Sequence, residues 1–136
     1  MKKQLVVIFT LVAIGLITFS CEPFIENKIT AKNLAAAGVV LNLRGQDYNI
    51  PSGETLVLND FKKGSFAYST VYQIPLGVTN SSTSGDVVGQ MNLLAGTEVL
   101  LVYTSVVDSA QYTLYGSLTT SDDINRVDPF ETGGTP

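Results

Sequence analysis

Short runs in which apolar and polar residues alternate with a period of two recur along most of this chain. Such alternation places every second side chain on one face of a β-strand, so each run predicts a half-buried strand. Residues that favour turns, mainly glycine, proline, asparagine and aspartate, separate the runs. Strands are therefore expected over residues 39–44, 48–50, 55–59, 66–72, 87–94, 98–104 and 112–118.

Three of the stretches carry more particular expectations. Residues 98–104 are apolar on both faces of the predicted strand, which is typical of the centre of a sheet. Pro75 and Gly77 favour an edge strand or a bulge over residues 74–79. Residues 80–86 are the most polar part of the chain, and we expect a mobile loop there.

Seven to eight short strands without a helix of useful length predict an all-β fold, an antiparallel two-sheet sandwich of immunoglobulin-like or related topology. Parallel pairing is not expected, because parallel strands are usually joined by helices that cover the sheet. A small closed β-barrel is the alternative. The prediction concerns architecture alone, since the chain has one cysteine and no tryptophan and so lacks the hallmarks of antibody domains.

The N-terminus has the layout of a secretion signal. Lys2 and Lys3 precede an apolar run over residues 5–19, which is interrupted by Thr10, Gly15 and Thr18. As a helix, this run would reach only about 22 Å, short of the roughly 30 Å hydrocarbon core of a bilayer. A cleaved signal is therefore expected in preference to a transmembrane helix.

The residues Thr18-Phe19-Ser20-Cys21 resemble the lipobox of bacterial lipoprotein signal peptides, in a loose form like that of Bacteroidota. Thr18 stands where most members of that family have leucine. The resemblance implies cleavage between Ser20 and Cys21 by signal peptidase II, and attachment of fatty chains such as palmitate to Cys21. Two or three such chains make release from a membrane negligible. A small buried cysteine is the alternative for Cys21.

The expected organisation is a signal peptide over 1–20, a lipid-anchored tether over 21–27, a β-sandwich domain over 28–120 and a C-terminal tail over 121–136. The resemblance implies an outer-membrane lipoprotein on the periplasmic face or at the cell surface. Glu22 and Glu26 are similar to the acidic tethers that direct some Bacteroidota lipoproteins to the surface, and an ordinary solvated linker explains them equally well.

Charge argues against nucleic acid as a partner. Without residues 1–20 the chain keeps six basic and twelve acidic residues, a net charge of −6. The phosphate backbone of a nucleic acid would repel such a protein. The expected contacts are therefore a membrane, reached through the N-terminal lipid, and another component of the cell envelope.

The absence of histidine from the sequence removes Ser-His-Asp catalysis, histidine bases and most zinc sites. A Ser-Lys dyad would need Lys62 or Lys63, which are adjacent in a predicted turn. The tail residues Asp122, Asp123, Asn125 and Asp128 do not have the spacing of an EF-hand, so no metal or other cofactor is predicted. The carboxylates that could form a catalytic pair fall at predicted turns or strand ends: Asp47, Glu54, Asp60, Asp86, Glu98 and Asp108.

Tyr48 and Tyr115 are candidate ligand-binding residues, because an exposed tyrosine ring can stack on a sugar. The other four tyrosines occupy strand positions where a half-buried ring is expected. Asp108-Ser109-Ala110 resembles the short acceptor pattern for O-linked glycans in Bacteroidota, which implies glycosylation of Ser109. A plain turn is the alternative for these three residues.

Three functions remain. The first is a non-enzymatic lipoprotein whose β-sandwich binds or scaffolds another cell-envelope component. The second is a surface module that binds a glycan or another small ligand through Tyr48 or Tyr115. The third, least favoured by the residue types, is a small hydrolase that depends on two carboxylates.

Overall fold

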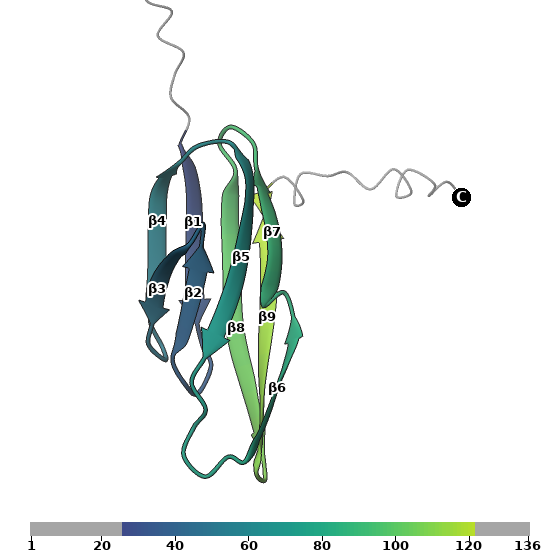
Figure 1. Cartoon of the computed structure of the whole chain (residues 1–136). Helices are drawn as coiled ribbons and strands as arrows, with labels where there is room; N and C mark the ends of the chain where they lie inside the picture. The colour runs from purple at the N-terminus through teal and green to yellow at the C-terminus, as the bar shows by residue number, and fades with distance from the viewer. Residues whose placement is uncertain (1–25, 122–136) are drawn as a thin grey trace, which may run out of the picture.

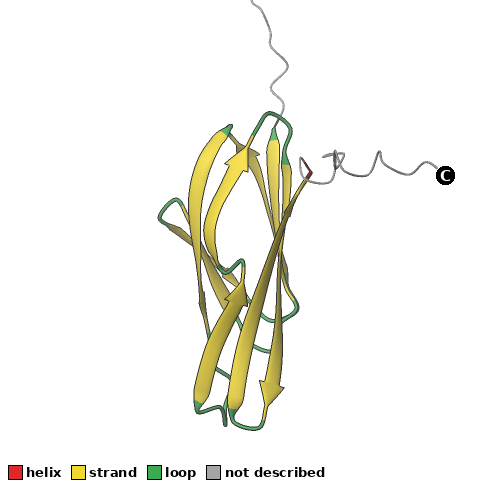
Figure 2. Cartoon of the chain, turned by 90° about the vertical axis from the view of Figure 1, so that its right-hand side faces the viewer, coloured by secondary structure: helices red, strands yellow, loops and turns green. Residues whose placement is uncertain are grey.

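The computed structural model describes residues 26–121. These residues form two β-sheets that face each other as two layers (Figures 1 and 2). The five-stranded sheet has the order β4-β1-β8-β9-β6, and the four-stranded sheet has the order β3-β2-β5-β7. Within the described residues the strands are β1 (Asn27–Asn33), β2 (Val39–Leu43), β3 (Gln46–Ile50), β4 (Thr55–Phe61), β5 (Gly64–Tyr72), β6 (Asn80–Gly85), β7 (Val88–Leu93), β8 (Glu98–Asp108) and β9 (Gln111–Thr120).

The predicted all-β, two-sheet sandwich is confirmed. Its sheets end in β4 and β6 and in β3 and β7, so residues 26–121 do not close into the barrel that was the alternative. The structure has nine strands over these residues, where seven to eight were expected. The additional strands are β1 and β6, neither of which has a run of large apolar residues at alternate positions.

The prediction of a mobile loop over residues 80–86 is wrong, because residues 80–85 form the edge strand β6. Its backbone pairs with β9 from Asn80 to Gly85. Its hydroxyl side chains also have partners, since the Ser82 hydroxyl lies 3.0 Å from the Thr113 hydroxyl and Tyr72 donates to Ser81 over 3.1 Å. A polar composition therefore does not prevent a strand where a neighbouring strand supplies hydrogen-bond partners.

Two of the seven strand pairings are parallel, which the sequence analysis did not expect. β1 runs parallel to β8, and β6 runs parallel to β9, while the other five pairings are antiparallel. Neither parallel pair needs a helical crossover. The chain between the partners passes through the opposite sheet, and this passage supplies the length that a parallel connection requires.

The core lies between the sheets and is lined by the inward-facing residues of both. β8 is the central strand of its sheet, as predicted, and Val99, Leu101 and Tyr103 are buried on its inner face. Its outer face is open, since Leu100 is 40% exposed. The expectation that both faces of this strand are buried is therefore wrong. None of residues 26–121 forms a second layer over the outer face, and an antiparallel sandwich commonly leaves this face to solvent.

Residues 74–79 form a turn between β5 and β6, so the prediction of an edge strand or bulge there is wrong. Gly77 has a φ of 86°, a conformation that suits glycine. The Val78 amide donates to the Pro75 carbonyl over 3.3 Å. The turn carries the chain from the four-stranded to the five-stranded sheet, and it leaves Leu76 completely exposed.

One long side of the sandwich is closed where the chain crosses from β6 to β7. The Asp86 amide donates to the Gly116 carbonyl over 2.8 Å, and the Asp86 carboxylate accepts from the Leu118 amide over 3.0 Å. Tyr68 of the other sheet donates to the Asp86 carbonyl over 3.2 Å. A Cβ atom on Gly116 would lie 2.7 Å from the Asp86 carbonyl oxygen, so this crossing requires glycine at position 116.

The other long side is joined at its two ends, by residues 51–54 between β3 and β4 and by residues 62–63 between β4 and β5. Asn33, at the end of β1, is fully buried and secures the first of these connections. Its side-chain amide donates to the carbonyls of Ala37 and Ile50, and its side-chain oxygen accepts from the Ala35 amide, all over 2.9 to 3.0 Å. Between these two connections, none of residues 26–121 crosses this side.

Candidate binding surfaces

The predicted lipidation and cleavage residues lie outside the described part of the chain. Ser20 and Cys21 precede residue 26, and most of the predicted tail follows residue 121. Lipidation of Cys21 and the boundaries of the signal peptide therefore stay predictions. Within residues 26–121 no helix has the length and hydrophobicity needed to cross a bilayer.

A groove of about 500 Å³ opens on the side of β3 and β4. It lies between the β2–β3 turn and the end of β4. We call it the edge groove, and its lining consists of Leu43, Arg44, Gln46, Tyr48, Asp60, Phe61 and Lys62.

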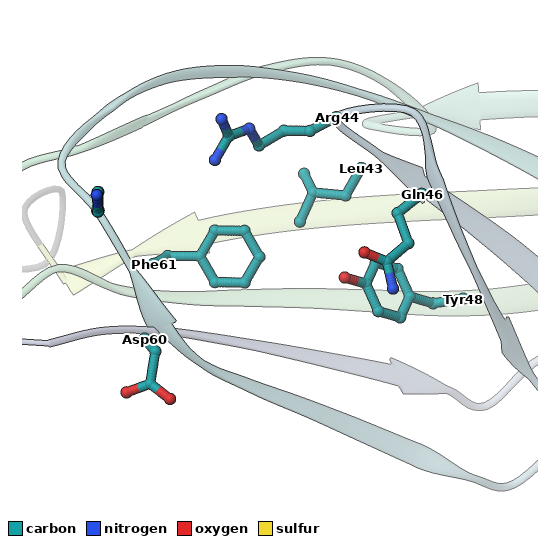
Figure 3. Close-up of a pocket in the computed structure, with 7 residues that line it drawn as sticks. Leu43, Arg44, Gln46, Tyr48, Asp60 and Phe61 are labelled. Carbon is teal, nitrogen blue, oxygen red and sulfur yellow. The ribbon is translucent and has the colours of Figure 1, made fainter.

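The edge groove has an apolar floor and aromatic walls. Figure 3 shows the ring of Phe61 pointing across the groove toward Leu43, with Tyr48 and Gln46 on the far side. Leu43 is buried, whereas Tyr48 and Phe61 are half-buried and pack against the core. The two rings thus offer apolar surface to a ligand, while the four other lining residues besides Leu43 are polar or charged.

Arg44 occupies the rim of the groove in an unusual backbone conformation. It has a φ of 56° and is followed by Gly45 with a φ of 80°, which are the values of a two-residue hairpin turn. The Gly45 amide donates to the Asn42 side chain over 3.3 Å and supports the turn. The guanidinium carbon lies 4.8 Å above the centre of the Phe66 ring. Arg44 is therefore held by an aromatic ring, and its positive charge stays available to a ligand.

The opposite rim is shaped by a β-bulge in β4. Asn27 pairs with Phe61 and Ile29 pairs with Leu58, so β4 contains one more residue than β1 over this interval. Asp60 lies in the bulge with a φ of 65°. Backbone conformations of this kind concentrate at functional sites, and both Arg44 and Asp60 line the same groove.

A second carboxylate lies beside this rim. A side-chain hydrogen bond with Asp60 raises the pKa of Glu26, and the negative charge of Asp60 contributes in the same direction. Both carboxylates are exposed to solvent. Water screens the charges of such an exposed pair.

The six carboxylates proposed for a catalytic pair are not brought together by hydrogen bonds to one another. The partner of Asp60 is Glu26, the Asp47 carboxylate accepts from Asn42 over 2.6 Å, and Asp86 accepts from the backbone of Leu118. The described residues also hold no group of three or more histidine, cysteine, aspartate or glutamate side chains that could bind a metal. The two lysines proposed for a Ser-Lys dyad are both exposed in the β4–β5 turn.

The second candidate surface is on the outer face of the five-stranded sheet, at the end formed by the β8–β9 hairpin. We call it the hairpin face. It surrounds a shallow depression of about 480 Å³. Its lining consists of Asn80, Val106, Asp108, Ser109, Ala110, Gln111, Thr113 and Tyr115.

The two tyrosines predicted to bind a ligand therefore belong to different surfaces. Tyr48 lines the edge groove, and Tyr115 lies on the hairpin face, where it is 41% exposed. Ser109 is exposed at the tip of the hairpin with a φ of 55°, within the turn that was the alternative for this segment. Its position would allow a modifying enzyme to reach the hydroxyl, and its glycosylation stays a prediction.

Sequence reasoning missed the residues that complete both surfaces. Arg44 falls at the end of the predicted strand 39–44, Phe61 falls between two predicted strands, and Asn80 falls in the predicted mobile loop. The alternation of apolar residues carries no signal for a site at the edge between two sheets. Arg44-Gly45-Gln46-Asp47 between two strand-like runs does predict the turn between β2 and β3, but it does not indicate a groove beside that turn. A comparison of the chain with protein-family models, with curated proteins and with solved structures gives no match.

Proposed function

We propose that this protein is a non-enzymatic, lipid-anchored component of the cell envelope whose β-sandwich binds another envelope component in the edge groove. The observation that carries the proposal is an aromatic-walled groove on the side of β3 and β4. The membrane anchor itself rests on the resemblance of residues 18–21 to a lipobox.

The position of the groove relative to the expected anchor supports this function. Asn27, the first residue of β1, pairs with Phe61 in the groove wall, and Glu26 contacts Asp60 in the rim. Glu26 is five positions after Cys21, so the two residues lie at most about 18 Å apart when the chain is fully extended. A lipid on Cys21 would therefore keep the edge groove close to the membrane surface.

The composition of the groove indicates what it would bind. Tyr48 and Phe61 provide two rings for an apolar or planar group. Arg44 and Lys62 outnumber Asp60, the one carboxylate of the lining, and a guanidinium suits paired hydrogen bonds to a carboxylate or phosphate. The expected occupant has an apolar part and an anionic group, such as an exposed segment of a membrane protein with an acidic residue beside an aromatic one.

The anchor is tested by the intact mass of the protein purified from its native membranes, with Cys21→Ala as the comparison. We expect a mature chain that begins at Cys21 and carries acyl mass, and release of the Cys21→Ala chain from the membrane. A mature chain that begins elsewhere, or that carries no acyl mass, would contradict the anchor.

The groove is tested by co-purification from detergent-solubilised membranes, with quantitative mass spectrometry of the bound proteins. We expect the double variant Tyr48→Ala, Phe61→Ala to lose a partner that the unmodified protein retains. The matched control is Val71→Ala, Val88→Ala, which removes two exposed apolar side chains from the outer face of the same four-stranded sheet. Equal loss in both variants, or no reproducible partner, would contradict binding in the groove.

A further inference from the structure

The hairpin face is at the opposite end of the domain from the start of β1. Figure 1 shows the β8–β9 hairpin and the start of β6 at the lower end, while β1 begins at the upper end. β8 and β9 have 11 and 10 residues, and β2 and β3 of the other sheet have 5 each. The two long strands thus project past the short ones, and β6 widens the projecting part of the sheet.

The register of β8, β9 and β6 arranges the outward side chains in rows. Tyr115 lies between Thr104 of β8 and Ser84 of β6. In the next row Thr113 has Val106 on one side and Ser82 on the other. In the last row Gln111 stands between Asp108 and Asn80.

This arrangement leaves one aromatic ring standing among small side chains. The cross-strand neighbours of Tyr115 are a threonine and a serine, and its neighbours along the outer face of β9 are Thr113 and Ser117. None of these is large enough to cover the ring, which agrees with its exposure of 41%. Val106, which is 53% exposed, adds an apolar surface one row away.

The polar groups around the ring are held in place by hydrogen bonds. The Ser82 hydroxyl lies 3.0 Å from that of Thr113, and the side-chain amide of Gln111 donates to Ser82 over 3.5 Å. The backbone amides of Thr79 and Asn80 donate to the Ala110 carbonyl over 2.9 and 3.1 Å, which fixes the start of β6 against the hairpin. A ligand would therefore meet donors and acceptors that are already positioned.

We infer that the hairpin face is a binding site for a neutral glycan chain, with Tyr115 as the stacking platform. One face of a pyranose ring carries C–H groups and packs on an aromatic ring, while its hydroxyl groups seek amide, hydroxyl and carboxylate partners at the edge. Gln111, Asn80 and Asp108 supply these partners in a single row. Because Asp108 is the one charged residue of the lining, the surface favours an uncharged sugar over an acidic one.

This site goes beyond the function proposed for the edge groove and shares no residue with it. The edge groove lies beside the tether and is suited to a ligand near the membrane. The hairpin face projects from the other end of the domain, where a glycan would be reached without contact with the bilayer. The two sites can therefore fail independently.

The experiment is a binding titration of the full protein in a polyoxyethylene detergent, which contains no sugar. The probes are gluco-, xylo- and manno-oligosaccharides of six units and, as the acidic counterpart, hexagalacturonate. Binding is followed by chemical shifts of isotope-labelled backbone amides. Intact mass confirms beforehand that Ser109 carries no sugar, so that an attached glycan is not mistaken for a bound one.

We expect at least one neutral oligosaccharide to shift the amides of β9 and β6, and hexagalacturonate to bind at least tenfold more weakly. Tyr115→Ala should weaken binding at least tenfold, whereas Tyr115→Phe, which keeps the ring, should weaken it less than threefold. Val71→Ala, on the outer face of the four-stranded sheet and in neither candidate surface, is the control and should leave the affinity unchanged.

The inference would be overturned if no neutral oligosaccharide shifted the amides at a concentration of about 10 mM, because the dissociation constant would then lie well above that concentration. Unchanged affinity in Tyr115→Ala would also overturn it. A folded spectrum of each variant, compared with that of the unmodified protein, ensures that a loss of binding reports on the side chain and not on unfolding.

Discussion

The two long sides of the sandwich differ in how the sheets are joined. On the side of β6 and β7, the chain crosses between the sheets, and Asp86 connects Tyr68 of one sheet with Gly116 and Leu118 of the other. On the side of β3 and β4, connections lie only at the two ends of β4, and the edge groove opens beside the connection to β5. We call these the crossed side and the open side.

The difference separates residues that maintain the fold from residues that are free to bind. The crossed side has close backbone contacts at Gly85 and Gly116, which tolerate no larger residue. The open side has half-buried rings and two non-glycine residues with positive φ, Arg44 and Asp60. Such conformations cost stability, and the rest of the fold must compensate for them.

The largest effect is expected from a change that breaks the crossed side. In Gly116→Ala the new methyl group would lie 2.7 Å from the Asp86 carbonyl oxygen and 3.0 Å from the Val87 amide nitrogen. Backbone atoms cannot move away as a flexible side chain could, so the free energy of unfolding should fall by about 3 kcal/mol or more. Urea denaturation followed by circular dichroism measures this change.

The matched control for Gly116→Ala is Gly53→Ala, in the connection between β3 and β4. A Cβ atom there would have no neighbour within 4 Å, and only the φ of 82° opposes it. The expected cost is about 1 kcal/mol. Equal destabilisation by the two substitutions would show that the close contact at the crossed side has no special role.

The second effect concerns the end of the open side where residues 51–54 connect β3 to β4. Asn33→Ala would remove three hydrogen bonds from a fully buried position and leave the carbonyls of Ala37 and Ile50 and the Ala35 amide without that partner. We expect a loss of about 2–3 kcal/mol in the free energy of unfolding, because buried polar groups without partners are costly. Substitution of the exposed Asn49 by alanine is the control, and a similar loss there would contradict this role of Asn33.

The third effect tests a contact between the sheets that belongs to neither side. The hydroxyls of Tyr103 and Thr70 lie 2.7 Å apart, and burial raises the pKa of Tyr103 to about 12. In the unfolded chain a tyrosine ionises near pH 10, so between pH 10 and 12 the unfolded state loses its proton first. Stability should therefore fall as the pH rises through this window, by about 1.4 kcal/mol per pH unit for this group.

Tyr103→Phe should flatten the dependence of stability on pH above pH 10, which urea denaturation at a series of pH values measures. The raised pKa of Tyr68 contributes in the same direction, so a part of the dependence should remain. An unchanged slope in the variant would show that Tyr103 is not the group responsible.

The smallest effect on stability is expected on the open side. Tyr48 is half-buried at an edge strand, so Tyr48→Ala should cost only about 1 kcal/mol. If Tyr48→Ala has nearly the same midpoint of thermal unfolding as the unmodified protein but loses a bound partner, then the open side serves binding and the crossed side serves stability. A loss as large as that of Gly116→Ala would instead make the open side a structural element.

The regular part of the fold was predictable from sequence because it depends on alternation. The runs around Val39, Phe66 and Val99 bury large apolar residues at every second position, and each of them is a strand. β6 was not predictable in this way. The Ser82 hydroxyl pairs with that of Thr113, and the Ser81 hydroxyl accepts from Tyr72, so the stabilisation of this strand depends on neighbours distant in the sequence.

The candidate sites were predictable only in part. Tyr48 and Tyr115 were identified by type and strand position, but their assignment to separate surfaces depends on which strands pair. The edge groove needs the β4 bulge to place Asp60 opposite Arg44, and a bulge leaves no periodic signal in the sequence. Local patterns therefore identify candidate residues, whereas the pairing of strands decides which of them meet.

Site-specific photo-crosslinking in living cells tests the central claim most directly. A photoreactive residue replaces Gln46, in the lining of the edge groove, or Gln90, an exposed glutamine of β7 at the opposite edge of the same sheet. We predict a discrete adduct with one envelope component from position 46 and none from position 90. Adducts of equal yield from both positions, or none from position 46, would contradict binding at the open side.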